Sequence, residues 1–116
     1  MHKYRELKVW QKAMDVTIAV YKKTSDLPIS EKFGLLSQIR RCAVSIPSNI
    51  AEGAGRNSPG EFKQFLGIAN GSTFELQTQL LILNRLNYMD DINNEILFNE
   101  LEEIQKMLFV LMKSVN

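Results

Sequence analysis

Cysteine and histidine are almost absent from this 116-residue chain, which has one of each, Cys42 and His2. A single cysteine cannot form an internal disulfide or a multi-thiolate zinc site. A single histidine, in an N-terminal segment that we expect to be mobile, provides no positioned imidazole for Ser-His-Asp or Cys-His catalysis or for a histidine-based metal site. We therefore expect no catalytic residues, no metal and no cofactor.

Long apolar runs are also missing. The longest, residues 80–83 and 107–112, are far shorter than the roughly 18 residues that cross a bilayer. The first residues lack the apolar stretch and the small-residue cleavage site of a secretory signal. With 45% hydrophobic and 23% charged residues, the composition is typical of one globular domain over residues 1–116. We expect a cytoplasmic protein with no membrane partner and no small-molecule substrate.

The net charge of +1 hides an uneven distribution. Residues 1–56 contain ten Lys and Arg against five Asp and Glu, whereas residues 57–116 contain four against eight. Two interpretations stay open, because a basic half can contact a polyanion or can match acidic helices or subunits of the same protein.

Hydrophobic periodicity predicts four helices and no strand. The apolar positions are Trp10, Ala13, Met14, Ile18 and Tyr21; then Leu35, Ile39, Cys42, Ala43, Ile46 and Ile50; then Phe62, Phe65, Leu66, Ala69, Thr73, Leu76, Leu80 and Leu83; and finally Leu97, Leu101, Ile104, Leu108, Leu111 and Val115. In the first helix, Val9, Val16 and Val20 widen the apolar arc. Short connections favour an all-α fold, an antiparallel up-down-up-down four-helix bundle.

The ends of these helices have recognisable signals. Ser30 is a candidate N-cap for the second helix, with Glu31 in its first turn. Gly53 and Gly55 are available for a left-handed cap at its end. The run from Ser58 to Glu61, SPGE, combines a capping serine, proline at the first helical position and glutamate three residues after the cap, so it predicts the start of the third helix.

Proline interrupts the predicted second helix at position 47. Pro47 has no N–H for the carbonyl of Ala43, and its ring pushes against that carbonyl. We expect a kink at this point, eased by the hydroxyls of Ser45 and Ser48.

The third helix has a second face, opposite its core stripe. Its members are Gly67, Gly71, Phe74, Thr78, Leu81 and Ile82. A glycine inside a helix costs roughly 1 kcal/mol relative to alanine, which suggests that another helix approaches closely there. That helix belongs either to a second subunit, making the face a homo-oligomer interface, or to the same chain.

The second helix also has a polar stripe, away from its apolar side. It consists of Arg41, Ser45, Ser48, Asn49, Glu52 and Arg56. Arginine binds phosphate with a planar fork, and Ser and Asn add neutral hydrogen bonds. The alternative is an intersubunit or interhelix network in which Glu52 pairs with Arg56 or Arg41. Cys42, on the apolar side, is expected to be a small buried residue rather than a nucleophile.

Several segments together resemble a known family. They are residues 7–13 (LKVWQKA), 31–35 (EKFGL) and 38–53 (QIRRCAVSIPSNIAEG), extended by Arg56, 62–66 (FKQFL), 68–72 (IANGS), Glu75 and Leu76. In these segments, which cover nearly the whole chain, the sequence resembles the bacterial four-helix-bundle proteins called 23S rRNA intervening-sequence proteins. The SIPSNIAEG run is the most specific part of the match.

The resemblance implies an antiparallel four-helix bundle that assembles as a homopentamer and is not an enzyme. A related branch comprises accessory proteins of diversity-generating retroelements, pentamers that bind a reverse transcriptase and nucleic acid. Our first hypothesis is an oligomer with an RNA- or nucleoprotein-associated role, whose candidate phosphate contacts are Arg40, Arg41, Arg56 and Lys63. The alternative is a protein–protein interaction scaffold that binds no nucleic acid.

Overall fold

The chain folds into four long helices. The computed structural model describes residues 2–28, 30 and 34–115. A short 3₁₀ turn, η1 (Tyr4–Glu6), precedes α1 (Lys8–Lys23), α2 (Leu35–Ala54), α3 (Pro59–Arg85) and α4 (Asp91–Ser114). The described residues contain no strand, so the prediction of an all-α fold with four helices is confirmed.

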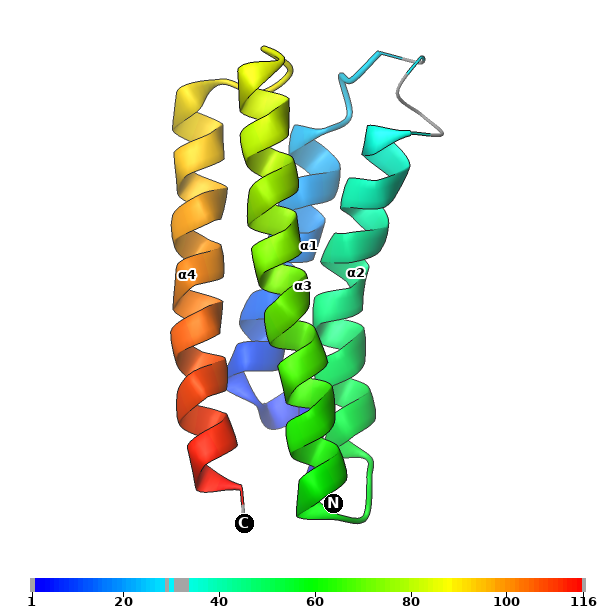
Figure 1. The fold of residues 1–116 in the computed structure, drawn as a ribbon, viewed down its shortest axis with the longest axis vertical. Coiled ribbons are helices and arrows are strands. Elements are labelled where there is room, and N and C mark those ends of the chain that lie inside the picture. The colour runs from blue at the N-terminus through cyan, green and yellow to red at the C-terminus, as the bar shows by residue number, and fades with distance from the viewer. Residues whose placement is uncertain (1, 29, 31–33, 116) are drawn as a thin grey trace.

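The helices lie side by side along the long axis of the molecule, and each runs opposite to the one before it (Figure 1). Contacts between α1 and α4 show that these two helices also run in opposite directions, because residue numbers rise along one helix as they fall along the other. Lys12 Nζ lies 2.9 Å from Glu103 Oε2, and Lys23 Nζ donates to Asn93 Oδ1 at 2.5 Å.

One apolar core runs along the axis of the bundle. Its largest fully buried members are Ile39, Ile46, Ile50, Phe62, Leu66, Leu76, Leu80, Leu83, Leu97, Leu101, Ile104 and Leu108, from α2, α3 and α4. All of them belong to the predicted apolar positions. The three stripes are therefore confirmed.

The stripe predicted for the first helix is partly wrong. Ile18 and Tyr21 are exposed, and Trp10 and Met14 are only half-buried. Of the predicted positions Ala13 is buried, and the core side of α1 is completed by Val9, Val16 and Val20. Two apolar stripes lie next to each other on this helix, and packing between α2 and α4 decides which of them is buried.

Pro47 lies inside α2, which continues as one helix to Ala54. The carbonyl of Ala43, which Pro47 cannot engage, accepts a hydrogen bond from Thr17 Oγ1 of α1 at 3.1 Å. The hydroxyl of Ser45 is directed to the carbonyl of Cys42 instead, at 2.5 Å. The hydrogen bond that we expected from Ser45 or Ser48 thus comes from a threonine of another helix.

Two predicted helix ends differ from those observed. The α2 helix begins at Leu35, preceded by Gly34 in a non-helical conformation, so Ser30 does not cap it, and Glu31 lies outside the described residues. At the other end no glycine has a positive φ; Gly55 has φ −83°. A Cβ on Gly53 would lie 2.7 Å from the Cβ of Phe65, so Gly53 serves the close approach of α2 and α3.

Other local signals were correct. The Ser58 side chain accepts a hydrogen bond from the Glu61 amide at 3.1 Å, and Pro59 is the first residue of α3. Asp90 caps α4 in the same way, through the Asn93 amide at 2.7 Å. In the N-terminal segment, the His2 amide donates to the carbonyl of Ala54 at 2.9 Å.

None of the helices in the described part of the chain is long and apolar enough to cross a membrane.

Candidate functional site

A polar groove of about 470 Å³ separates the outer sides of α2 and α3. It is lined by Ser37, Gln38, Arg41, Cys42, Ser45, Asn49, Ile68, Ser72 and Glu75. Three members of the predicted polar stripe, Arg41, Ser45 and Asn49, are therefore brought together in one concave surface. We call this surface the α2–α3 groove.

Hydrogen bonds fix the floor of the groove. Ser45 Oγ lies 2.8 Å from Ser72 Oγ, which joins the two helices. Asn49 Nδ2 donates to the Ser45 carbonyl at 2.7 Å, which fixes this side chain against α2. Small polar side chains at these positions let α2 and α3 meet while leaving hydrogen-bonding groups at the surface.

Cys42 lies at the inner edge of the groove and is buried. Its thiol donates to the Ser72 carbonyl oxygen at 3.2 Å and lies 3.5 Å from Glu75 Oε1. Burial, reinforced by the negative charge of Glu75, raises the pKa of the Cys42 thiol to about 12. The burial predicted for Cys42 is therefore confirmed, and the raised pKa disfavours the thiolate, which is the reactive form.

The candidate phosphate contacts do not form one surface. Arg40 donates to the Tyr21 carbonyl at 3.1 Å and to Thr24 Oγ1 at 3.2 Å, and its guanidinium lies over the Tyr21 ring. It therefore caps the C-terminal end of α1. Arg41 is exposed, and within the described part of the chain its one hydrogen bond goes to Ser37 Oγ, at 3.3 Å. Of these two arginines, only Arg41 presents its charge to the groove.

The other two candidates lie elsewhere. Arg56 pairs with Glu52 at 3.3 Å and with Glu61 at 3.7 Å, and its guanidinium lies over the Phe65 ring. The alternative interpretation of the stripe, a network between Glu52 and Arg56, is therefore confirmed at this end. Lys63 is exposed on α3, one turn before Gly67, away from the α2–α3 groove.

The polar stripe is thus divided between two sides of α2. Ser48 and Glu52 line a separate, mostly apolar hollow against α1, whose other residues include Tyr4, Trp10 and Met14. A residue step of three or four places side chains on one face of an isolated helix, but neighbouring helices on both sides of α2 separate these side chains into different surfaces.

The second face of α3 is not covered by any residue that the structure describes. All six members, Gly67, Gly71, Phe74, Thr78, Leu81 and Ile82, are exposed. Nothing lies within 4 Å of a Cβ placed on Gly67 or Gly71. These glycines therefore do not admit another helix of the same subunit, and that alternative is wrong. We call this surface the α3 face.

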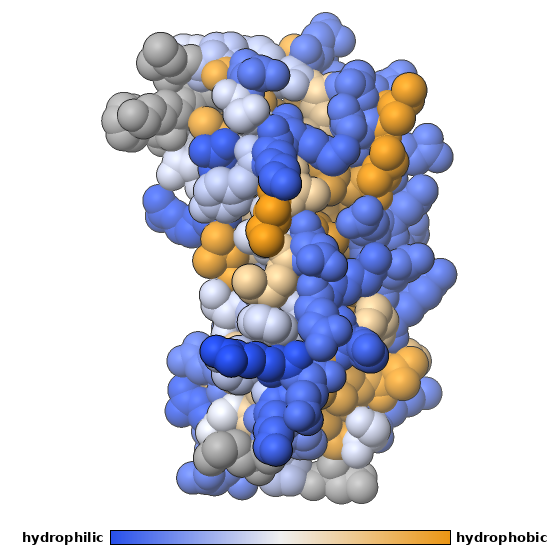
Figure 2. Space-filling model, turned by 180° about the vertical axis from the view of Figure 1, so that it is seen from behind, coloured by the Kyte–Doolittle hydropathy of each residue, from blue (hydrophilic) through white to orange (hydrophobic). Residues whose placement is uncertain are grey.

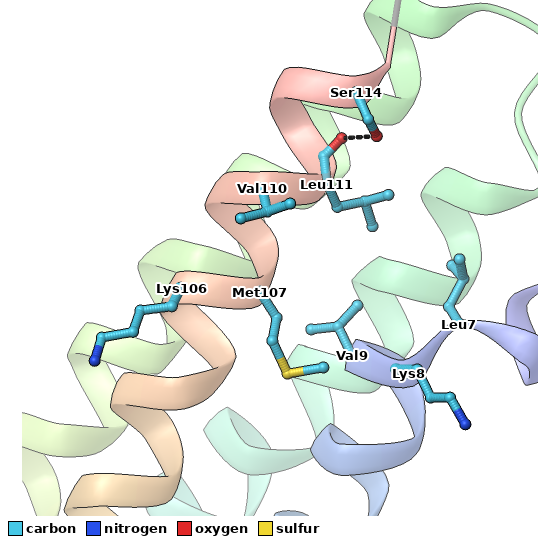
Figure 3. A pocket seen from close by; sticks show the side chains of 8 residues that line it. All are labelled: Leu7, Lys8, Val9, Lys106, Met107, Val110, Leu111 and Ser114. Carbon is cyan, nitrogen blue, oxygen red and sulfur yellow. Dashed lines mark hydrogen bonds between the residues drawn. The ribbon is translucent and has the colours of Figure 1, made fainter.

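Sequence reasoning missed an apolar groove of about 450 Å³ between the first residues of α1 and the last turns of α4. In Figure 3, Met107 and Leu111 point toward Val9 and Leu7, and the groove lies between them. Its other lining residues are Lys8, Lys106, Val110 and Ser114. A length difference was the available signal: α1 has 16 residues and α4 has 24, so α1 leaves part of α4 uncovered.

The described residues contain no group of three or more His, Cys, Asp or Glu side chains placed to hold a metal ion.

Comparison with known proteins points to one family. A family model described as 23S rRNA-intervening sequence protein matches residues 5–110. A crystal structure from Bacteroides thetaiotaomicron, described as a protein with unknown function from the S23 ribosomal protein family, is 28% identical, with a TM-score of 0.81. That match covers 91% of this chain and 99% of the other. No curated protein matches the sequence.

Proposed function

Since the chain belongs to the 23S rRNA-intervening sequence protein family, we propose that it is a non-enzymatic homopentamer that contacts RNA, free or in a nucleoprotein, through the α2–α3 groove. Ser45 and Asn49 of this groove come from the most specific family motif, residues 45–53, and Arg41 lies four residues before it. The groove is a binding surface and not a reaction site.

The observation that carries the proposal is the position of Arg41. Among the described residues it is the one basic side chain that lines the α2–α3 groove, and none of their carboxylates lies within ion-pair distance of it. An exposed guanidinium beside hydroxyl and amide groups suits a phosphate, with Ser45 and Asn49 available to the sugar or base. Glu75, on the opposite side of the groove, is available to accept from an amino group of a base.

We propose assembly through the α3 face as part of the same function, because one Arg41 per chain gives only a weak RNA site. A homo-oligomer repeats the α2–α3 groove once per subunit, and several weak contacts on one RNA molecule raise its apparent affinity. Exposed glycines and large apolar side chains on one helix face are a suitable surface for the close approach of a second subunit.

Fluorescence anisotropy with a structured ribosomal RNA fragment, measured from low to physiological salt, tests the proposal. We expect Arg41→Ala to weaken binding about tenfold and to flatten the salt dependence, since each lost phosphate contact reduces the slope. Arg56→Ala is the matched control, because Arg56 is already paired with two carboxylates. Equal affinities of the wild type and Arg41→Ala, or no binding at low salt, would reject an RNA-binding groove.

A second candidate function is a protein–protein scaffold without nucleic-acid binding. The ion pairs of Arg56 with Glu52 and Glu61 favour it, because they use part of the polar stripe to join α2 to α3. In that case the wild type does not bind RNA, and Arg41→Ala lowers the mass or the stability of the assembly instead. Sedimentation of the same variant distinguishes the two functions.

A further inference from the structure

The α2–α3 groove differs from the two hollows beside α1 in the charges that line it. Those two hollows, on the side of the molecule that Figure 2 shows, are mostly apolar, and hydrophobic side chains are visible there between hydrophilic ones. Lys8 and Lys106 border one of them and Glu52 the other, so each has charge of a single sign. The α2–α3 groove is lined by both Arg41 and Glu75. It therefore suits a ligand that carries an anionic group and also N–H donors.

Three small side chains on the floor of the groove use their own hydrogens within the protein. Ser45 Oγ donates to the Cys42 carbonyl at 2.5 Å, and the Cys42 thiol donates to the Ser72 carbonyl at 3.2 Å. A hydroxyl has one hydrogen, so the bond between Ser45 Oγ and Ser72 Oγ, 2.8 Å apart, takes its hydrogen from Ser72. These bonds link the three residues in a ring. The three side chains therefore offer lone pairs to a ligand and no hydrogen.

The carboxylate of Glu75 is the strongest acceptor that remains open in the groove. Its Oε1 lies 3.5 Å from Cys42 Sγ, which places the carboxylate beside the residue that follows Arg41. Glu75 is exposed, and within the ranges that the structure describes no Lys or Arg lies in ion-pair distance of it. An ionised carboxylate is an acceptor only, and its two oxygens are able to accept two parallel N–H bonds at once. Glu75 therefore favours a ligand with two adjacent N–H donors.

Among the four RNA bases, guanine has this pattern on its Watson–Crick edge, where the N1–H and the N2 amino group lie side by side. Adenine and cytosine have one amino group next to a ring nitrogen without hydrogen, whose lone pair would repel the second carboxylate oxygen. Uracil has a single N–H between two carbonyl groups. In single-stranded RNA the Watson–Crick edge is open to a protein. A carboxylate therefore favours guanine by attraction and disfavours the other three bases by repulsion.

We propose that the α2–α3 groove recognises an unpaired guanosine of RNA, an inference that rests on the function proposed above for this groove. The Watson–Crick edge of the guanine binds the Glu75 carboxylate through two N–H bonds, and the Arg41 guanidinium binds a phosphate of the same strand. Ile68, which is 47% exposed, lines the same groove and offers an apolar surface to the base. Arg41 thus supplies affinity for the strand, and Glu75 supplies the choice of base.

Four RNA hairpins that differ at one loop position, G, A, C or U, test the choice of base; the rest of each loop contains no guanine. In fluorescence anisotropy at low salt, we expect the G loop to bind the wild type about tenfold more tightly than the others, the usual effect of one bidentate base contact. An inosine loop, which keeps N1–H but lacks the N2 amino group, should lose most of that preference.

The hairpins also separate this proposal from the function on which it rests. Equal affinities for all loops, in RNA whose binding Arg41→Ala weakens, would overturn the recognition of guanosine and leave the RNA-binding groove standing. No binding of any hairpin to the wild type would reject the groove, and guanosine recognition with it.

Glu75→Gln tests the role of the carboxylate. Glutamine has nearly the same shape, but its amide has one acceptor and one donor in place of two acceptors, so the preference for the G loop should fall to about twofold or less. The matched control is Glu95→Gln, which removes the same charge from an exposed residue of α4 that has no ion pair in the described part of the chain. A Glu75→Gln protein that keeps the wild-type preference, or a Glu95→Gln protein that loses it, would overturn the assignment of Glu75.

Discussion

At the scale of single residues, Thr17 supplies a hydrogen bond to the carbonyl that Pro47 leaves without a backbone donor in α2. Its hydroxyl donates to the Ala43 carbonyl at 3.1 Å, the acceptor that Pro47 leaves without a backbone donor, and lies 2.7 Å from the carbonyl of Ala13. A buried carbonyl without a partner loses the water that it had in the unfolded chain. One hydroxyl therefore stabilises both α2 and its contact with α1.

We predict that Thr17→Val lowers the free energy of unfolding by about 1–3 kcal/mol, the usual cost of leaving a buried polar group unpaired. Valine keeps the shape of threonine but cannot donate to Ala43. Urea denaturation measures the loss. Thr17→Ser is the control, since it keeps the hydroxyl, and valine and serine variants of equal stability would show that packing alone matters here.

The pH dependence of stability should reveal the Cys42 thiol. Burial raises its pKa from 9.0 to about 12, so the folded chain keeps a proton that the unfolded chain releases above about pH 9. The stabilising contribution of the protonated thiol is complete below pH 9 and is lost as the pH rises toward 12. In thermal unfolding from pH 7.5 to 10.5, the wild type should lose more stability than Cys42→Ala. Parallel pH profiles of the two proteins would be inconsistent with a raised thiol pKa.

At the scale of helices, two glycines with the same intrinsic helix propensity have different roles, because only one of them faces a neighbouring helix. Gly53 lies where α2 meets α3, and an added Cβ would come within 2.7 Å of Phe65 and 3.1 Å of the Phe62 ring. Gly60, in the first turn of α3, has nothing within 4 Å of an added Cβ. Helix propensity favours alanine at both positions, so the neighbouring helix determines the sign of the effect.

We predict that Gly53→Ala destabilises the bundle by about 1–3 kcal/mol, the typical cost of forcing an extra carbon into a packed contact. The backbone-proximal Cβ of Phe65 cannot move aside without shifting α3. Gly60→Ala, a matched control, should be neutral or slightly stabilising in the same denaturation experiment. A Gly53→Ala protein as stable as the control would mean that α2 and α3 separate at little cost.

At the scale of the whole molecule, the four helices bury one core and leave large apolar side chains on two outer surfaces. The α3 face presents Phe74, Leu81 and Ile82, and α4 presents Ile92 and Val110. Single exposed apolar residues are ordinary, but apolar residues aligned along a helix are a candidate surface for another protein. The α3 face is the surface that we propose for assembly.

We predict that Phe74→Glu dissociates the assembly into smaller oligomers or monomers at micromolar concentration. Phe74 is 53% exposed in the single chain, so glutamate is tolerated by the fold but introduces a charge into the proposed α3 interface. Sedimentation velocity gives the mass and circular dichroism checks the fold. Unchanged mass with a normal spectrum would exclude the α3 face as an interface.

The sequence alone was sufficient for the helices and for the stripes of α2, α3 and α4, because those stripes repeat over many turns and have strong caps such as Ser58. It was not sufficient for the candidate site. Ser45 and Ser48 are three residues apart on one helix, yet Ser45 faces α3 and Ser48 lines a hollow against α1. Side-chain spacing describes a helix in isolation and contains no information about its neighbours.

Local chemistry thus determined the number of helices, most of their boundaries and the family, since periodicity, capping and motif residues act within a few turns of chain. Only the tertiary structure decided which stripe of α1 is buried, which arginines are paired with a carboxylate and why position 53 needs glycine. The physical reason is that hydrogen bonds, ion pairs and close contacts between residues far apart in sequence depend on how helices pack, as when Thr17 completes the hydrogen bonding of Ala43.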